Sequence, residues 1–174
     1  KEFLKVKSDW LIKKKNLDLI EQYISKNFLL NIQPELTRFY IDEYLSIANI
    51  SKACEIFLKN KEPINDKYLS KVNIYCLIND QKNEEAQLIL DLKKETGFKD
   101  KYFEKKINFL LGYTNEVDKS ISEKSIFDFF LAHRTNSEFS FEPDEKTKKN
   151  IWKYLASSNL LYKIDEIQVT ELNK

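Results

Sequence analysis

The stretch DKYLSKVNIYCLINDQKNEEAQLILDLKKETGFKDKYFEKKINFLLG, residues 66–112, decides the fold class. Its apolar residues recur at intervals of three and four, the spacing that places them on one face of an α-helix. Either Asn65 or Asp66 precedes the first such run, and Asn83 and Asp100 precede the next two; each can accept a hydrogen bond from a free backbone amide of the first helical turn. Gly97 falls where a left-handed residue commonly ends a helix. The stretch therefore predicts three short helices separated by tight turns.

The same pattern continues toward the N-terminus. Apolar residues at helical spacing predict a helix from Ser8 to about Ser25, within which Asn16 can cap a second piece. Pro34 suits the first turn of a further helix, because the N–H group that proline lacks has no partner at that position. Asn49 or Ser51 is expected to begin the short helix that follows. The N-terminal part is therefore predicted to be helical throughout.

Further helices are expected toward the C-terminus. Ser120 and Glu123 match a capping box, in which each side chain covers a free backbone N–H of the other residue. A phenylalanine-rich run follows them. Pro143 and Asp144 provide a start signal for the next helix. The final residues fit a short helix or a strand equally well.

The composition supports an all-α protein and excludes several function classes. Only 2 glycines and 3 prolines occur in 174 residues, which argues against a β-sandwich or a dinucleotide-binding fold. The net charge is +1, and without a basic excess we expect no nucleic-acid partner. No run approaches the roughly 18 apolar residues that span a membrane. The chain starts at Lys1 and contains no methionine, so we expect a fragment of a longer protein.

An internal repeat refines the fold class. Ala53 and Ala86 lie 33 residues apart, and Tyr68 and Tyr102 lie 34 apart, which is close to the period of tetratricopeptide hairpins. We therefore predict antiparallel helix pairs stacked as a tetratricopeptide-like α-solenoid. Residues 1–174 are interpreted as one domain, with a repeat-like core at about 34–113 and C-terminal helices within 120–174.

Short motifs within this core carry a resemblance to a known family. They are Ala53-Cys54, Tyr75-Cys76, Glu85-Ala86-Gln87-Leu88, Gly97-Phe98-Lys99-Asp100-Lys101-Tyr102-Phe103 and Leu111-Gly112. Over about residues 35–115 the chain resembles a family of uncharacterised alphaproteobacterial proteins with tetratricopeptide-like helical repeats. The resemblance implies the front part of a longer, exported protein, and it implies no catalytic residue.

Cys54 and Cys76 are the only cysteines of the chain. Cys54 is expected on the second helix of one pair and Cys76 on the first helix of the next, and such helices are neighbours. The export that the resemblance implies would permit a disulfide between them. Two small buried thiols that fill core space are the other interpretation. Two cysteines without histidine partners do not make a zinc site, so no metal or other cofactor is expected.

His133 is the only histidine, and it has two interpretations. It can act as a general base if a nucleophile or a substrate lies nearby, which would make the protein an enzyme of unknown class. It can also complement the negative end of the helix that it terminates, which is the interpretation that we favour. No catalytic residue is therefore assigned.

The two arginines stand out because lysine is the usual basic residue of this chain. Arg38 precedes Asp42 by one helical turn, so we expect an intrahelical ion pair. Arg134 lies before a polar loop, where it can pair with a carboxylate or bind a partner. Phe139 and Phe141 belong to an aromatic cluster that closes the end of the stack, packs against a missing C-terminal part of the chain, or lines a peptide groove. Arg134, Phe139 and Phe141 are the candidate partner-binding residues.

These patterns together predict a non-catalytic protein–protein interaction or scaffolding module of a bacterial protein. Stacked helix pairs present an extended surface that can bind a peptide or a domain without special chemistry. Two alternatives remain, an enzyme that uses His133 and a structural segment of a larger envelope protein. The resemblance favours the periplasm or the cell envelope as the location.

Overall fold

The computed structural model describes residues 2–27, 31–58, 60 and 62–161. These residues form nine α-helices and no β-strand, so the all-α class is confirmed for them. The helices are α1 (Glu2–Lys14), α2 (Leu17–Asn27), α3 (Pro34–Ser46), α4 (Ile50–Glu55), α5 (Lys67–Asn79), α6 (Asn83–Glu95), α7 (Lys101–Leu110), α8 (Ile126–Arg134) and α9 (Lys149–Ser157). None of the helices in the described residues is long and apolar enough to cross a membrane. The final residues, for which a helix or a strand was expected, lie outside this part.

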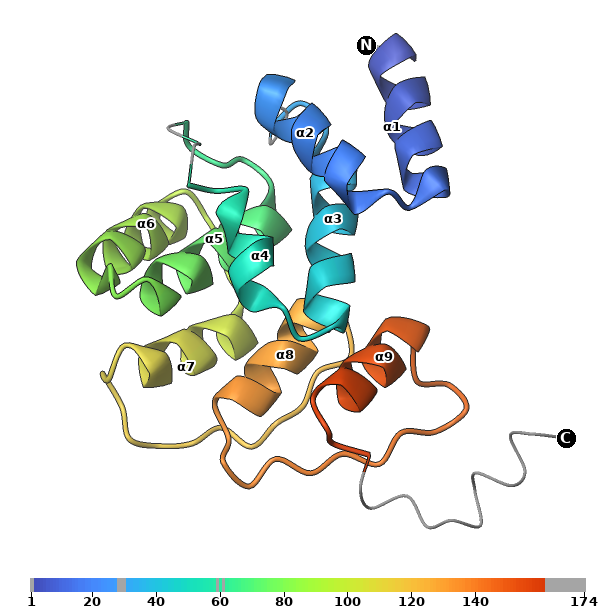
Figure 1. The fold of residues 1–174 in the computed structure, drawn as a ribbon. Helices are drawn as coiled ribbons and strands as arrows, with labels where there is room; N and C mark the ends of the chain where they lie inside the picture. Colours follow the sequence, from blue (N-terminus) through green and yellow to red (C-terminus); the bar gives the residue numbers. More distant parts are fainter. Residues whose placement is uncertain (1, 28–30, 59, 61, 162–174) are drawn as a thin grey trace, which may run out of the picture.

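The first six helices follow one another as three pairs, with short turns inside each pair (Figure 1). α1 packs against α2, α3 against α4, and α5 against α6. Successive pairs also touch, because α3 contacts α1, α2 and α5. α6 lies at the outer edge of the molecule, where its main neighbour is α5 (Figure 1).

The continuous stack expected from the sequence is not confirmed. α3 contacts α8 and α9 as well as the helices near it in sequence, and Figure 1 places both of these C-terminal helices below α3. In a solenoid, each repeat contacts only its neighbours. The composition of α8 explains the difference. Every residue from Ile126 to Ala132 is buried, and a helix that is apolar nearly all round needs cover on all sides.

Phe127 of α8 lies where three helices meet. Its ring centroid is 6.1 Å from that of Tyr68 and 6.0 Å from that of Tyr75, both on α5. The ring of Phe103 on α7 is 6.4 Å away. Phe127 is fully buried, so this aromatic contact joins α8 to both α5 and α7.

An ion cluster inside the fold also joins these helices. Lys71 Nζ of α5 lies 2.6 Å from Asp128 Oδ1 of α8 and 3.0 Å from Asp100 Oδ2, the cap of α7. Tyr102 Oη donates a hydrogen bond of 2.8 Å to the backbone carbonyl of Asp128. Because a buried charge without a partner costs several kcal/mol, roughly 3–5, the pairing of Lys71 favours one relative position of α5, α7 and α8.

Most of the predicted helix ends are confirmed. Side-chain oxygens accept a hydrogen bond of 2.9–3.1 Å from the backbone N–H three residues later at Asn16, Asn49, Asp66 and Asp100. Pro34 lies in the first turn of α3, and Gly97 adopts a left-handed φ of 90° after α6. The first helix begins at Glu2, which is earlier than the predicted Ser8.

The capping box predicted at Ser120 and Glu123 is wrong. Ser120 bonds to Asp118 through both its N–H (2.8 Å) and its hydroxyl, and such local bonds compete with helix formation. α8 instead begins after Ser125, whose Oγ accepts a hydrogen bond of 3.0 Å from the N–H of Asp128. The helix therefore starts directly before the apolar run.

Two other helix starts are shifted. Asn83 is the first helical residue of α6 rather than its cap. The helix expected to start at Pro143 and Asp144 begins at Lys149. Asp144 forms a turn instead, in which its N–H donates to Thr147 Oγ1 at 3.0 Å. This local turn satisfies the groups that would otherwise have capped a helix.

Candidate functional site

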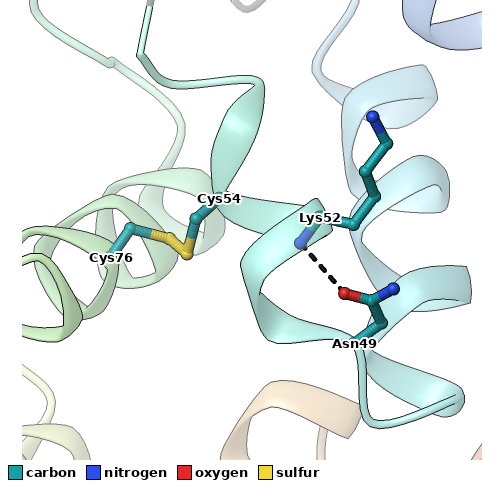
Figure 2. The surroundings of a disulfide bond; sticks show 4 residues. All are labelled: Asn49, Lys52, Cys54 and Cys76. Carbon is teal, nitrogen blue, oxygen red and sulfur yellow. Dashed lines mark hydrogen bonds between the residues drawn. A yellow bond between two sulfur atoms is a disulfide. The ribbon is translucent and has the colours of Figure 1, made fainter.

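A disulfide joins the second and third helix pairs (Figure 2). Cys54 of α4 and Cys76 of α5 are bonded with an S–S distance of 2.01 Å, and their Cα atoms lie 5.5 Å apart. That separation is within the usual range for a disulfide. The bond holds α4 against α5 along one side of the candidate site.

Short helix α4 depends on its surroundings. An isolated helix of 6 residues is not stable in water. Asn49 Oδ1 accepts a hydrogen bond of 3.1 Å from the N–H of Lys52 at the start of α4 (Figure 2). Ala53 is fully buried. The cap, this packing and the disulfide together keep α4 in place.

A second side of the site is the loop between α4 and α5, and its centre is Ile64. The Ile64 carbonyl accepts hydrogen bonds from Ser70 Oγ (2.9 Å) and from Lys93 Nζ of α6. Asn31 donates to the carbonyl of Pro63 (3.0 Å) and accepts from the N–H of Asn65 (2.9 Å). These four bonds fix the loop against three other parts of the chain.

A cleft of about 630 Å³ lies between this loop, α4, α5 and α6. Its apolar lining includes Phe57, Leu58, Ile64, Leu77, Ile89 and Leu92, beside Pro63 and the disulfide. Leu58 is 70% exposed and Leu92 is 52% exposed. Large apolar side chains at the mouth of a preformed hollow are typical of a binding site.

Three amide side chains add polar groups to this cleft, those of Asn60, Asn73 and Asn79. Asn60 donates to the carbonyl of Glu62 at 2.6 Å. Among the described residues, the side chains of Asn73 and Asn79 have no hydrogen-bond partner. Each can therefore donate to and accept from the backbone of a bound chain.

His133 lies at a different place from this cleft. Its Nδ1 is 2.7 Å from the hydroxyl oxygen of Tyr154, and its ring packs beside Phe139. Burial, together with the charge of neighbouring Arg134, lowers the pKa of His133. A smaller cavity of about 380 Å³ borders the ring. The ring partner is thus a phenol, whereas a catalytic histidine is commonly oriented by a carboxylate.

The candidate partner-binding residues are only partly accessible. Phe139 and Phe141 both pack edge-on against Phe129, with ring centroids 5.5 Å and 4.9 Å away. Phe139 is buried, whereas Arg134 is exposed and borders the cavity near His133. The aromatic pair therefore contributes to the core beside α8, and Arg134 is the most accessible of the three residues.

Arg38 does not form the predicted ion pair with Asp42. Its guanidinium instead bonds to both carboxylate oxygens of Asp66, the cap of α5. Asp42 accepts a hydrogen bond from the hydroxyl of Tyr68. Both bonds run between α3 and α5, which sequence spacing along one helix could not indicate.

Comparison of the chain with known protein families, with curated proteins and with solved structures finds no significant match. Within the described residues, no group of three or more histidine, cysteine, aspartate or glutamate side chains could hold a metal ion. The fold and the cleft together define an all-α domain with a preformed apolar hollow.

Proposed function

We propose that the chain is a non-catalytic protein–protein interaction module that binds an apolar segment of a partner in the cleft beside the disulfide. The observation that carries this proposal is the cleft of about 630 Å³ with Leu58 and Leu92 exposed at its mouth. Burying a leucine side chain completely is worth about 1.5–3 kcal/mol. Covering the exposed parts of these two side chains would therefore stabilise a complex by about 1–2 kcal/mol each.

The framework around the cleft supports binding without a large rearrangement. The disulfide holds α4 on α5, and Ser70 and Lys93 hold the loop at Ile64. A site that is already ordered loses little conformational entropy when a ligand binds. The amides of Asn73 and Asn79 are positioned to bond the ligand backbone.

The charges at the cleft favour a partner segment with basic residues. Four acidic residues line the cleft, compared with two lysines. Asp80 is paired with Lys82 at 2.6 Å and Glu55 with Lys52 at 2.5 Å. Among the described residues, Glu62 and Glu85 form no ion pair, and Lys93 bonds to a carbonyl. A segment with apolar side chains and a nearby lysine or arginine would complement this lining.

The finer architecture and the location belong to the same proposal. Three successive helix pairs, with turns that include the left-handed Gly97, support a short tetratricopeptide-like array. An intact disulfide suits the periplasm or the cell envelope, because cytosolic thiols are kept reduced. Both points agree with the family resemblance over about residues 35–115.

Peptide selection tests the cleft directly. The intact chain is immobilised and a random peptide library displayed on phage is panned against it. The affinity of recovered peptides for wild type, Leu92→Gln and Leu19→Gln is then measured by fluorescence polarisation. Leu92→Gln should weaken binding about tenfold, or roughly 1.4 kcal/mol. Leu19, an exposed leucine on α2, is the matched control and should leave the affinity unchanged.

Equal affinity for Leu92→Gln and wild type would place the peptide elsewhere and would refute the cleft. Failure to recover any peptide with a reproducible affinity would refute the binding function itself. Circular dichroism should confirm that both variants keep the helix content of wild type.

A structural segment of a larger envelope protein is the second candidate. Phe3, Val6 and Trp10 of α1 are all exposed, and their spacing of three and four places them on one helical face. Another helix could pack on such a face. In that case, replacing Trp10 would weaken the assembly and replacing Leu92 would not.

A further inference from the structure

A second cavity, of about 480 Å³, lies where α3, α5, α8 and α9 meet. Its lining is rich in basic residues, namely Arg38, Lys67, Lys71, Lys124 and Lys148. Only two acidic residues, Asp42 and Asp128, line it with them. This local excess of positive charge contrasts with the near-neutral balance of the whole chain.

The two acidic residues already have partners inside the fold. Asp128 accepts from Lys71 at 2.6 Å. Asp42 accepts from the hydroxyl of Tyr68. Burial raises the pKa of Asp42 to about 6, although that hydrogen bond and the charges of Arg38 and Lys148 oppose the shift. Lys71 offsets the charge of Asp128, whereas the uncharged hydroxyl of Tyr68 leaves the charge of Asp42 in place, where it attracts Lys148.

The cations divide into two groups. Arg38 is bonded to Asp66, and Lys71 to Asp100 and Asp128, so these two are neutralised. Lys67 instead donates to the backbone carbonyl of Lys99 at 3.1 Å. Lys148 donates to the backbone carbonyls of Glu123 and Lys124, at 2.7 Å and 2.9 Å.

Among the described residues, Lys67, Lys124 and Lys148 form no ion pair with a carboxylate. These three positive charges come from three separate segments of the chain. Asp42 partly offsets Lys148, and Asp100 partly offsets Lys67. The lining still holds five basic residues against two acidic ones, so the potential in the cavity stays positive.

The N-terminal ends of three helices add a smaller positive potential to that of the lysines. Residues from the first turns of α5, α8 and α9 line the cavity, and the N-terminal end of a helix carries a partial positive charge. α9 has no side-chain cap at Lys148. The convergence of three unpaired lysines in one hollow, rather than any single helix end, carries the inference.

We propose that this cavity binds a small molecule that carries a phosphate group. Lysine ammonium groups act as point charges that bind phosphate oxygens from several directions. The planar fork of Arg38, which would favour a flat carboxylate, is already used by Asp66. The site is independent of the apolar cleft, so either proposal can fail without the other.

Calorimetric titration of the full chain with inorganic pyrophosphate tests the site, with sodium acetate as the carboxylate comparator. Lys124→Gln and Lys148→Gln should each weaken pyrophosphate binding about tenfold. Lys149→Gln is the matched control, because Lys149 is the exposed neighbour of Lys148 and does not line the cavity. It should change the affinity less than twofold, and acetate should bind more weakly than pyrophosphate.

Absence of pyrophosphate binding at millimolar concentration would overturn the proposal. An equal loss in all three variants would show only general surface charge, which would overturn it as well. Lys124 makes no side-chain hydrogen bond within the described residues. Lys124→Gln therefore separates loss of binding from any local change caused by removing the carbonyl contacts of Lys148.

Discussion

Cys54 and Cys76 are 22 residues apart in the sequence, and the packing of α4 on α5 brings their Cα atoms to 5.5 Å. The sequence identified this pair but did not decide whether the two cysteines are bonded to each other or free. Spacing along the chain does not determine a distance through space when a loop intervenes. In the structure, the bond closes the loop that forms one side of the cleft.

Replacing both cysteines with alanine should lower the free energy of unfolding by about 3 kcal/mol, because the unfolded chain regains the entropy of a loop of this length. Urea denaturation followed by circular dichroism measures the loss. Reductant should destabilise the wild type by a similar amount and leave the double variant unchanged. A wild-type midpoint that does not move on reduction would contradict this prediction.

Charged residues show the same limit of sequence reasoning. Arg38 was expected to pair with Asp42 on its own helix, and it binds Asp66 at the start of α5 instead. Lys71 meets Asp128, which lies 57 residues further along the chain. Both partners lie at the ends of other helices. Such pairs appear only when the helices are packed.

At the scale of the element, helix starts follow local chemistry closely. Four side-chain caps lie where the sequence predicted them, because a cap involves residues only three positions apart. The error at α8 has a local cause too. The N–H and the hydroxyl of Ser120 both donate to Asp118, and Ser125 is the residue that caps α8.

Ser125→Ala should lower the free energy of unfolding by about 1 kcal/mol, because the N–H of Asp128 loses its acceptor. Ser120→Ala is the matched control. It removes only an exposed local bond and should cost less than about 0.5 kcal/mol. Thermal melts of both variants beside wild type provide the comparison. If Ser120→Ala lowered the free energy of unfolding more than Ser125→Ala did, Ser120 rather than Ser125 would be the cap, in contradiction to the structure.

For the molecule as a whole, α3 is the element that connects the N-terminal helices with the C-terminal helices of the described residues. It contacts α1 and α2 on one side and α8 and α9 on the other. A repeat array with neighbour-only contacts can unfold in parts. A chain whose C-terminal helices return to a central helix should unfold in one step.

Trp10 lies on α1, the first helix, and Trp152 lies on α9, the last helix of the described residues. In Trp10→Phe and Trp152→Phe, the urea transitions of the remaining tryptophan should coincide with each other and with circular dichroism. Phe127→Leu should move all of these transitions together and cost about 2 kcal/mol, because it opens space between three helices. Phe3→Leu at an exposed site should have little effect. Separate transitions for the two ends would support independent repeats.

The sequence by itself determined that the described chain is helical, where most helices begin, and which two cysteines could form a disulfide. These features depend on residues within a few positions of one another, so periodicity and capping are sufficient to predict them. Only the tertiary structure decided that α8 and α9 return to α3, that Phe139 is buried, and that three unpaired lysines meet at one cavity. Those outcomes depend on which apolar surfaces cover one another, and segments far apart in the sequence compete for that cover.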